Sequence, residues 1–262
     1  MIDRTSPRVT VVTPVYNGAR FVKRTLESVR AQTYPNIEHI IIDGGSTDDT
    51  MKIVALFQDR IDYSISEPDR GMYDAINKGF AKATGSIYCY LNSDDTYEPD
   101  AIEIAVNAIT DNNADLCIAN CIFIDQDDLE LFRYKGVPLT FQQARKLCRI
   151  PFNQPTAFWT KRLHELVGGF DANMRYVADT KFFYEALRVS DRAPAYLDHY
   201  VARFRQHEDG FSTTAALAME QEHLKVLAQI GAVPGIGRLA QEARVKWINR
   251  GNLLRGLSRR WK

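Results

Sequence analysis

Residues 87–95 read IYCYLNSDD, and this segment decides the fold. An apolar run up to Leu91 ends at two adjacent carboxylates, Asp94 and Asp95. In open α/β sheets, ligands bind at the edge where the parallel strands end, so a short strand followed by acids presents negative charge there. Neighbouring carboxylates repel each other, and a divalent cation that carries a diphosphate would neutralise them. The alternative is an ordinary acidic turn, because Asp is common in turns.

Three similar β-rich runs precede this segment, and each ends in a polar loop that contains Gly or Asp. Helical patterns of apolar residues lie between them, which predicts crossover connections and a mostly parallel, Rossmann-like central sheet in an α/β fold. We expect Pro14 to end the first strand and Ser46 or Thr47 to cap the helix after the second. The expected strands are 8–13, 37–42, 61–66 and 87–91.

The second half of the chain has a different pattern. Residues 115–124 form a long apolar run, and residues 130–134 can pair back with it across a polar turn. Further strands are expected at 155–160 and 195–204, and further helices at 101–109, 140–149, 177–189 and after Lys161. We divide the chain into residues 1–212 and a helical extension, 213–262, with a break near residues 234–235. The first part comprises a half up to about residue 115 and a half over about residues 116–212.

Composition indicates an ordinary globular protein. The chain has 262 residues, 45% of them hydrophobic and 25% charged, which suits one large domain with an appendage. Its 33 basic and 33 acidic residues cancel, so the overall charge indicates no nucleic-acid partner. The four cysteines have no metal-binding spacing, and we expect reduced core residues in a cytoplasmic protein. No segment has the pattern of a signal peptide or a membrane span.

Four motifs occur together in one order. They are Thr13-Pro14-Val15-Tyr16-Asn17, Asp43-Gly44-Gly45-Ser46-Thr47-Asp48, Asn92-Ser93-Asp94-Asp95 and the acidic helix start at Asp179. In this order and spacing, the region 8–212 resembles the family 2 glycosyltransferases, which are inverting, metal-dependent enzymes with the GT-A fold. The run 67–79, EPDRGMYDAINKG, is similar to a longer signature of members that build bacterial surface polysaccharides. Four motifs are more specific than any one of them.

The resemblance implies a nucleotide-sugar donor, with uridine diphosphate as the default nucleotide. Asp43 then contacts the nucleobase, with turn capping as its alternative, and residues 14–16 form a wall of the base pocket. Tyr16 could equally be a core aromatic residue. Arg70 has the planar cation that suits a diphosphate oxygen. Lys78 is a second candidate for the diphosphate or the ribose, and a solvated helix face is the alternative.

The same resemblance divides the acid pair. Asp94 would face the ribose, and Asp95 would coordinate Mn²⁺ or Mg²⁺, which bridges the two phosphates and stabilises the leaving nucleoside diphosphate. Few protein ligands are needed, because phosphates and water complete the coordination. His207 follows a strand and precedes Gly210, which makes it a candidate for a further ligand or a diphosphate contact. A lone histidine is more often structural.

Asp179 is the candidate catalytic base. Inversion requires in-line attack by an acceptor hydroxyl, and a carboxylate must take its proton. Many members of the family have an acid immediately before this aspartate, whereas Ala178 stands there in this chain. The alternative is that Asp179 only caps a helix or interacts with its dipole. On the acceptor side the candidates are Asn153-Gln154 and Trp159, although Trp159 could be a core residue.

Residues 238–262 form a basic tail with eight basic residues and Glu242 as the single acid, so its net charge is +7. On a helix, its large apolar residues would share one face: Trp247, Leu253, Leu254, Leu257 and Trp261. A basic amphipathic helix that carries Trp is typical of contact with an anionic membrane surface. The alternative is a helix that packs on the domain, and Gly251 and Gly256 argue against one long rigid helix.

The sequence therefore predicts an inverting glycosyltransferase that moves a sugar from a nucleotide-diphosphate sugar to a hydroxyl of a glycan or lipid-linked acceptor. We expect it in the cytoplasm or at the inner face of the membrane, in surface polysaccharide biosynthesis. The alternative is a non-catalytic nucleotide-sugar-binding module on the same fold. A sugar nucleotidyltransferase is a third reading, but residues 13–18 lack the glycine- and basic-rich loop that binds a triphosphate.

Overall fold

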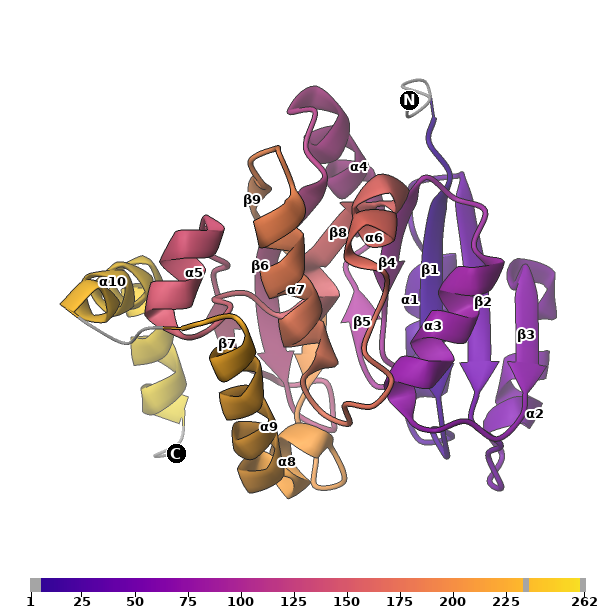
Figure 1. Cartoon of the computed structure of the whole chain (residues 1–262). Coiled ribbons are helices and arrows are strands. Elements are labelled where there is room, and N and C mark those ends of the chain that lie inside the picture. The colour runs from indigo at the N-terminus through magenta and orange to yellow at the C-terminus, as the bar shows by residue number, and fades with distance from the viewer. Residues whose placement is uncertain (1–5, 233–235, 260–262) are drawn as a thin grey trace.

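The computed structural model describes residues 6–232 and 236–259 (Figure 1). Within them, nine strands form one sheet in the order β3-β2-β1-β4-β8-β6-β9-β5, with β7 paired to β6. The strands are β1 (Val9–Val15), β2 (Ile37–Asp43), β3 (Tyr63–Ser66), β4 (Ile87–Tyr90), β5 (Thr96–Tyr97), β6 (Leu116–Ile124), β7 (Glu130–Tyr134), β8 (Ala157–Thr160) and β9 (Ala195–Arg205).

Helices flank both faces of this sheet (Figure 1). They are α1 (Val22–Arg30), α2 (Thr50–Ala55), α3 (Met72–Lys82), α4 (Ala101–Asp111), α5 (Phe141–Leu147), α6 (Lys161–Val167), α7 (Ala178–Val189), α8 (Phe211–Thr214), α9 (Ala216–Gln229) and α10 (Ile236–Arg259), with 3-10 turns η1 (Gln58–Arg60) and η2 (Gln154–Thr156).

The sheet is mixed but mostly parallel, which confirms the predicted fold class. Strands β1 to β4 are parallel to one another, as the alternation of strands and helices predicted. Strands β6 and β9 run in the same direction, whereas β5, β7 and β8 run in the opposite one. The predicted hairpin between β6 and β7 is present. Strand β5, only two residues long, was not predicted from the sequence.

Strand β4 contributes side chains to two hydrophobic cores, one on each face of the sheet. Ile87, Cys89 and Leu91 belong to the core that α4 covers on one face, and Tyr88 and Tyr90 belong to the core under α3, α6 and α7 on the other. Successive side chains of a strand point to opposite faces, so a continuous apolar run is what a strand between two helical layers requires. The strand that delivers the acid pair is therefore held from both sides.

The prediction that Pro14 ends the first strand is wrong. Strand β1 continues to Val15, and Pro14 lies opposite Ile42 of β2. The carbonyl of Val12 accepts a hydrogen bond from Leu91 N–H on the β4 side, and backbone groups alternate between sides, so Pro14 faces the β4 side as well. Because β4 ends at Tyr90, the missing N–H of proline has no ladder partner to lose there.

The predicted cap of the helix after β2 is also wrong. Helix α2 begins at Thr50, with Asp49 in the cap position. Ser46 instead donates its hydroxyl to Asp43, and the backbone N–H of Thr47 donates to Asn17 Oδ1 at 2.9 Å. These two residues thus connect the ends of β1 and β2 and leave the helix start to residues further along the chain.

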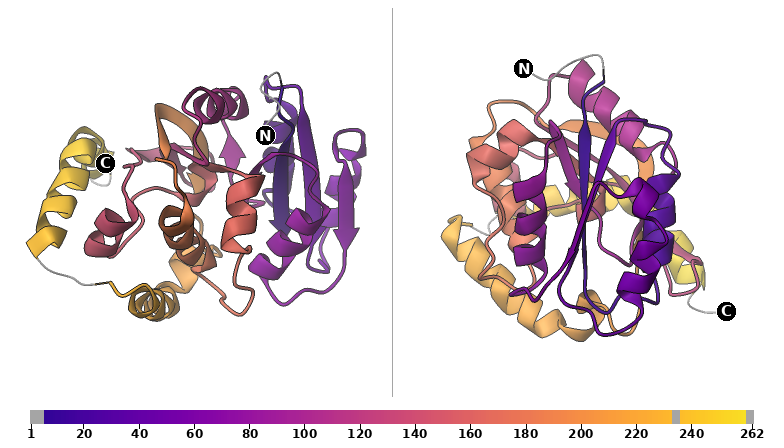
Figure 2. Two further views of the ribbon diagram at one scale, coloured as in Figure 1. Left: turned by 45° about the horizontal axis from the view of Figure 1, so that its top comes forward. Right: turned by 90° about the vertical axis from the view of Figure 1, so that its right-hand side faces the viewer.

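The C-terminal helices share a core with the domain. Val226 of α9 and Val245 of α10 are buried in one cluster with Val177 and Tyr184, on either side of the start of α7. Asn249 of α10 accepts a hydrogen bond from the backbone N–H of Lys135, in the segment between β7 and α5, at 2.6 Å. It also donates a hydrogen bond to the Lys135 carbonyl at 3.1 Å. Figure 2 shows α9 and α10 at the opposite end of the molecule from β3. The proposed division at residue 212 stays a prediction.

Helix α10 has a second, exposed face, so packing on the domain and an outward surface occur together. Leu239 and Trp247 are 69% and 64% exposed. The tail residues Leu253, Leu254 and Leu257 lie outside the side chains that the structure describes, and so do Trp261 and the predicted break at residues 234–235. No helix within the described residues is long and apolar enough to cross a membrane.

Candidate functional site

The candidate residues meet at the edge where the parallel strands end. Asp43 is the last residue of β2, Asp94 and Asp95 follow β4, and His207 follows β9. Because β1, β2, β4, β6 and β9 run in one direction, their carboxyl ends lie on the same side of the sheet. The chain also changes direction across the sheet at β1: β2 and β3 lie on one side of β1, and β4 lies on the other. Such a switch point is where α/β sheets bind ligands.

Asp94 and His207 are in direct contact. The imidazole Nε2 lies 3.0 Å from Asp94 Oδ2, although the residues are 113 positions apart in the sequence. The side chain of Asp94 is 31% exposed, whereas that of His207 is 9% exposed. The Phe21 ring of the segment before α1 packs 4.8 Å from the imidazole ring centre. An oxygen and a nitrogen ligand are thus presented side by side at the sheet edge.

Asp95 faces the interior instead. It is 1% exposed, its Oδ1 accepts the backbone N–H of Arg205 at 2.9 Å, and its backbone carbonyl accepts the Thr25 hydroxyl at 2.8 Å. Burial, reinforced by the charge of Asp94, raises the pKa of Asp95 well above its usual range. Asp94 is thus the more exposed of the two acids, and the expected roles, Asp94 at the ribose and Asp95 at the metal, stay predictions.

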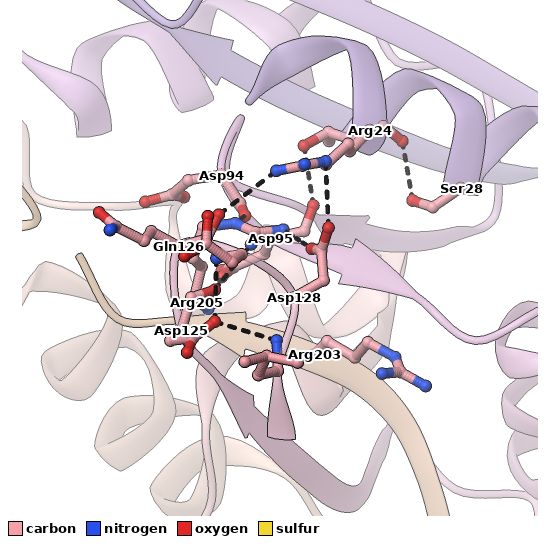
Figure 3. A network of polar contacts seen from close by, with 12 residues as sticks. Arg24, Ser28, Asp94, Asp95, Asp125, Gln126, Asp128, Arg203 and Arg205 are labelled. Carbon is pink, nitrogen blue, oxygen red and sulfur yellow. Dashed lines mark hydrogen bonds and ion pairs between the residues drawn. The ribbon is translucent and has the colours of Figure 1, made fainter. Parts of the chain in front are cut away.

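Arg205 stabilises the loop after β4, residues 92–95, which we call the acid loop. The sequence pattern did not indicate this role. Its guanidinium is fully buried and donates to the carbonyls of Asp94 and Asp125 at 2.8 Å each. It also donates to Asp128 Oδ1 at 2.5 Å. Figure 3 shows how this side chain joins the loop after β4 to the β6–β7 turn, while Arg24 of α1 reaches the same Asp128 at 3.1 Å. The signal available in the sequence was a basic residue at the end of a predicted strand.

The acid loop fits a metal ion that is shared with a phosphate ligand. Among the described residues, no group of three or more His, Cys, Asp or Glu side chains could hold a metal on its own. Asp94 and His207 nevertheless offer two ligands, and the buried Oδ2 of Asp95 and Oδ1 of Asn92 have no hydrogen-bond partner. Ions such as Mg²⁺ are usually held by one or two carboxylates together with phosphate oxygens and water. The donor set suits that arrangement.

The Asp43 side chain stabilises the turn after β2. It is completely buried, and Oδ2 accepts hydrogen bonds from Gly45 N–H, Ser46 N–H and the Ser66 hydroxyl at 3.2, 2.9 and 2.6 Å. Gly45 has a φ of +83°, which favours glycine at that position. The turn-capping alternative for Asp43 is thus realised. Oδ1 accepts one described hydrogen bond, from the Ser46 hydroxyl, so it keeps capacity for another donor.

Tyr16 is not a core residue. It follows the last residue of β1 and is 64% exposed, whereas Val15 before it is buried. An exposed aromatic ring beside a switch point is available to stack on a flat ligand. Asn17 next to it has a φ of +49°, and its Oδ1 accepts the N–H of Thr47. The loops after β1 and β2 are therefore fastened together on the side where a nucleobase is expected.

Arg70 precedes α3 and Lys78 lies within it, and both are paired with acids. Arg70 contacts Asp74 at 2.7 Å with its side chain 71% exposed, and Lys78 contacts Glu67 at 2.8 Å. The side-chain bond to Asp74 raises the pKa of Arg70, and the bond to Glu67 raises that of Lys78. Exposed ion pairs of this kind contribute little stability, so an incoming diphosphate can compete for the cations.

Asp179 lies in the first turn of α7. Its Oδ1 accepts the N–H of Thr180 at 2.7 Å and lies 3.1 Å from the Tyr73 hydroxyl. That hydroxyl also lies 3.0 Å from the carbonyl oxygen of Tyr176. None of the described hydrogen bonds ends on Oδ2, so this oxygen is available to accept a proton. Burial raises the pKa of Asp179 above its usual value, against the effect of the bonds from Thr180 and Tyr73.

On the expected acceptor side, Trp159 is a core residue. It is completely buried in β8 and packs against Phe182 with ring centres 5.2 Å apart. Gln154 lies closer to the acid loop: its Nε2 donates to the Tyr90 carbonyl at 2.7 Å, and its Oε1 is buried without a partner. Asn153 next to it is partly buried. Of the three residues, Trp159 is excluded as a sugar-stacking surface by its burial.

Known proteins share both the sequence pattern and the fold. The profile of "Glycosyl transferase family 2" matches residues 10–180. A "PGL/p-HBAD biosynthesis glycosyltransferase" of Mycobacterium bovis is 27% identical over 227 residues, which cover 85% of this chain and 84% of that protein.

Solved structures confirm the architecture. S. aureus TarS 1–349 in complex with UDP-GlcNAc superimposes with a TM-score of 0.69 at 16% identity, over 93% of this chain and 72% of that one. Another TarS structure is longer, and the match covers 42% of it. A mannosyltransferase of Pyrobaculum calidifontis, in complex with GDP-Man and Mn²⁺, gives a TM-score of 0.62 at 21% identity, over 98% of this chain and 75% of that one. At these identities the structures show the fold alone. The profile match extends from β1 to the start of α7 and so includes the switch point, the acid loop and Asp179; the chain belongs to glycosyl transferase family 2.

Proposed function

We propose that the protein is an inverting glycosyltransferase that transfers one sugar from a nucleotide-diphosphate sugar to a hydroxyl of a glycan or lipid-linked acceptor. The observation that carries this proposal is the contact between Asp94 and His207 at the carboxyl edge of the sheet. Two potential metal ligands from distant segments meet there, beside buried oxygen atoms that have no partner. A site of this kind suits a diphosphate and its counter-ion.

The donor lies across the ends of β1 and β2 in this proposal. Tyr16 stacks on the nucleobase, Pro14 closes the pocket behind it, and Asp43 Oδ1 accepts from a base N–H. Arg70 and Lys78 exchange their acidic partners for diphosphate oxygens. A UDP-sugar is the first donor to test, because TarS is described with UDP-GlcNAc, and GDP-Man is the second, because the Pyrobaculum enzyme is described with it.

Asp94 and His207 would hold Mn²⁺ or Mg²⁺, with Asp95 as the buried support of the loop. This proposal differs from the expectation that Asp95 is the ligand: Asp95 Oδ1 accepts the N–H of Arg205, and Oδ2 has no described partner. The metal would supply positive charge that stabilises the leaving nucleoside diphosphate. The Pyrobaculum mannosyltransferase, which is described in complex with GDP-Man and Mn²⁺, supports the inclusion of a metal in this proposal.

Asp179 is the proposed base. Its Oδ2, which no described hydrogen bond occupies, takes the proton of the acceptor hydroxyl as that oxygen attacks the anomeric carbon. The bond from the anomeric carbon to the diphosphate breaks on the opposite face, so the configuration inverts. A pKa raised by burial suits this role, because a base with greater proton affinity removes a hydroxyl proton more effectively.

A membrane-bound acceptor is supported by the outer face of α10. At about 100° per residue, Leu239, Ala243 and Trp247 share this face. Lys246 lies on one flank and Arg244 on the other, whereas Arg250 falls within the face. The Arg250 guanidinium lies over the Trp247 ring at 4.7 Å. An apolar strip between basic flanks matches an anionic lipid surface. We place the protein at the inner face of a membrane, where a lipid-linked acceptor is within reach.

A thermal-shift panel tests the donor and the metal together. UDP-glucose, UDP-galactose, UDP-GlcNAc, GDP-mannose and dTDP-rhamnose are each measured with and without Mn²⁺, since ligands stabilise the state that they bind. The proposal expects stabilisation by one nucleotide class that increases with Mn²⁺. Turnover of that donor should be abolished in Asp179→Asn, with donor binding retained. A protein that binds the donor but has no measurable turnover with water or any acceptor extract would instead be a binding module.

A further inference from the structure

Glu222 of α9 connects the C-terminal extension to the segment that precedes Asp179. Its carboxylate accepts three backbone hydrogen bonds: from Arg175 N–H at 2.9 Å, from Tyr176 N–H at 2.7 Å and from Val177 N–H at 2.9 Å. Helix α7 has no side-chain cap of its own at this end. Bonds from N–H groups to a charged acceptor are stronger than neutral ones, and an anion is favoured near a helix N-terminus.

The Tyr176 peptide unit is held from two sides. Its N–H donates to Glu222, and its carbonyl oxygen lies 3.0 Å from the Tyr73 hydroxyl, which in turn lies 3.1 Å from Asp179 Oδ1. A continuous polar path therefore runs from α9 through this backbone segment and α3 to the proposed base. Apolar contacts reinforce it, because Val226, one helical turn after Glu222, is buried in the same cluster as Val177.

We propose that Glu222 is a positioning residue for Asp179: by fixing residues 175–177 it sets the direction in which the Asp179 carboxylate points. This inference rests on the proposed role of Asp179 as the base. The carboxylate comes from another helix and not from the neighbouring position, where this chain has Ala178. The extension is thereby part of the catalytic architecture and not only an attachment to it.

The same arrangement has an electrostatic consequence. The titratable groups that act on Asp179 come from three elements: Tyr73 of α3, Tyr90 of β4 and Glu222 of α9. Burial is the largest cause of the raised pKa of Asp179; the negative charge of Glu222 raises it further, whereas the Tyr73 hydrogen bond lowers it. Removing the charge at position 222 and removing the hydroxyl at position 73 should therefore shift the titration of Asp179 in opposite directions.

The test is a titration of Asp179 in the full-length chain with ¹³C-labelled aspartate, which needs no substrate. The Asp179 signal is assigned as the one that is missing in Asp179→Asn. In Glu222→Gln the pKa of Asp179 should fall by about half a unit or more, because a nearby like charge is lost, and in Tyr73→Phe it should rise. Glu222→Asp keeps the charge and should restore the wild-type value. Glu220→Gln, at an exposed position of the same helix, is the matched control.

Hydrolysis of the donor that binds best in the thermal-shift panel, with water as the acceptor, gives the second readout. In Glu222→Gln we expect kcat to fall at least about tenfold, the factor that corresponds to one pKa unit. The KM for the donor should stay constant. An unchanged Asp179 titration in Glu222→Gln, with only a lower melting temperature, would overturn the inference. If Glu222→Gln does not fold, an unchanged Asp179 titration in Tyr73→Phe would overturn the inference as well, because the polar path to Asp179 runs through the Tyr73 hydroxyl. Full turnover by Asp179→Asn would reject the base itself, which is a separate result.

Discussion

The Nε2 atom of His207 lies 3.0 Å from Asp94 Oδ2, and Asp95, the next residue along the chain, turns its carboxylate inward to the backbone of Arg205. Two adjacent acids thus have different surroundings. One is positioned to share a ligand with an imidazole, and the other holds the loop in place. Substitutions at these positions should therefore separate metal binding from folding.

Asp94→Asn and His207→Gln should weaken Mn²⁺ binding by about a hundredfold, at least as much as the loss of an outer ligand partner costs. Asp95→Asn should leave the metal ligands in place and act mainly on the folded state. Electron paramagnetic resonance of Mn²⁺ in the presence of UDP measures the binding, and thermal melting measures the stability. The assignment fails if Asp95→Asn loses the metal while Asp94→Asn retains it.

Arg205→Met should destabilise the protein by about 3 kcal/mol or more, because the buried guanidinium is lost from several acceptors at once. Its partners are the carbonyls of Asp94 and Asp125 and the carboxylate of Asp128. Arg203 is the matched control: it lies on the same strand, and its pair with Glu98 is partly exposed, so Arg203→Met should cost about 1 kcal/mol or less. Urea unfolding gives both values, and equal losses would contradict the role of Arg205.

Stability should fall as the pH falls from 6.5 toward 4. Burial lowers the pKa of His39 from 6.5 to about 3 and that of His164 to about 4. In this window the unfolded imidazole binds a proton that the folded one does not, so each histidine contributes a loss of about 1.4 kcal/mol per pH unit on acidification.

His39→Gln isolates one of these contributions. Glutamine can replace the imidazole as a hydrogen-bond partner of Thr13, which lies 3.0 Å from His39 Nε2. The free energy of unfolding at pH 4.5, 5.5 and 6.5 should then change with pH by about 1.4 kcal/mol per unit less than in the wild type. His199→Gln, at a position 61% exposed, should keep the wild-type slope. The same slope in both variants would contradict a neutral, buried His39.

Binding to vesicles should depend on the basic residues on and beside the outer face of α10. Replacing Arg244, Lys246 and Arg250 by Gln should weaken binding to phosphatidylglycerol-containing vesicles by about a hundredfold, since each basic residue near an anionic surface contributes about 1 kcal/mol. Trp247→Ser should weaken it further. Lys52→Gln with Arg60→Gln, exposed and remote on α2 and η1, serves as the control. Equal binding to neutral phosphatidylcholine vesicles would remove the electrostatic argument.

Much of the fold could be predicted because its signals are local. The β-rich runs with polar loops predicted β1 to β4 and their parallel order, and the polar turn at residues 125–128 predicted the β6–β7 hairpin. The prediction that Pro14 ends the first strand failed because the cost of proline depends on the strand that its missing N–H would face. On that side β4 has already ended, and the sequence around Pro14 does not show this. Strand β5 was missed because two residues carry no periodicity.

The site was predictable in its residue types but not in its contacts. The motifs indicated Asp94, Asp95 and Asp179, and its position after a strand made His207 a candidate. Two neighbouring aspartates nevertheless look alike in the sequence until burial distinguishes them. Arg205 and Glu222 form hydrogen bonds with backbone groups. Every residue type has these groups, so such contacts leave no pattern in the sequence of the partners. Only Arg205 had a signal in the sequence, a basic residue at the end of a predicted strand. The role of that residue depends on the loop that its side chain contacts.

One short segment of the chain, residues 205–222, touches both ends of the site: it supplies His207 beside Asp94 and Glu222 beneath the start of α7. Chains fold from the N-terminus during synthesis. A nascent chain can therefore assemble β1 to β4 and the proposed donor side early. Neither the proposed metal ligands nor the proposed support of Asp179 is complete until this late segment has left the ribosome. In the proposed mechanism, activity is thus acquired only when this late segment has folded.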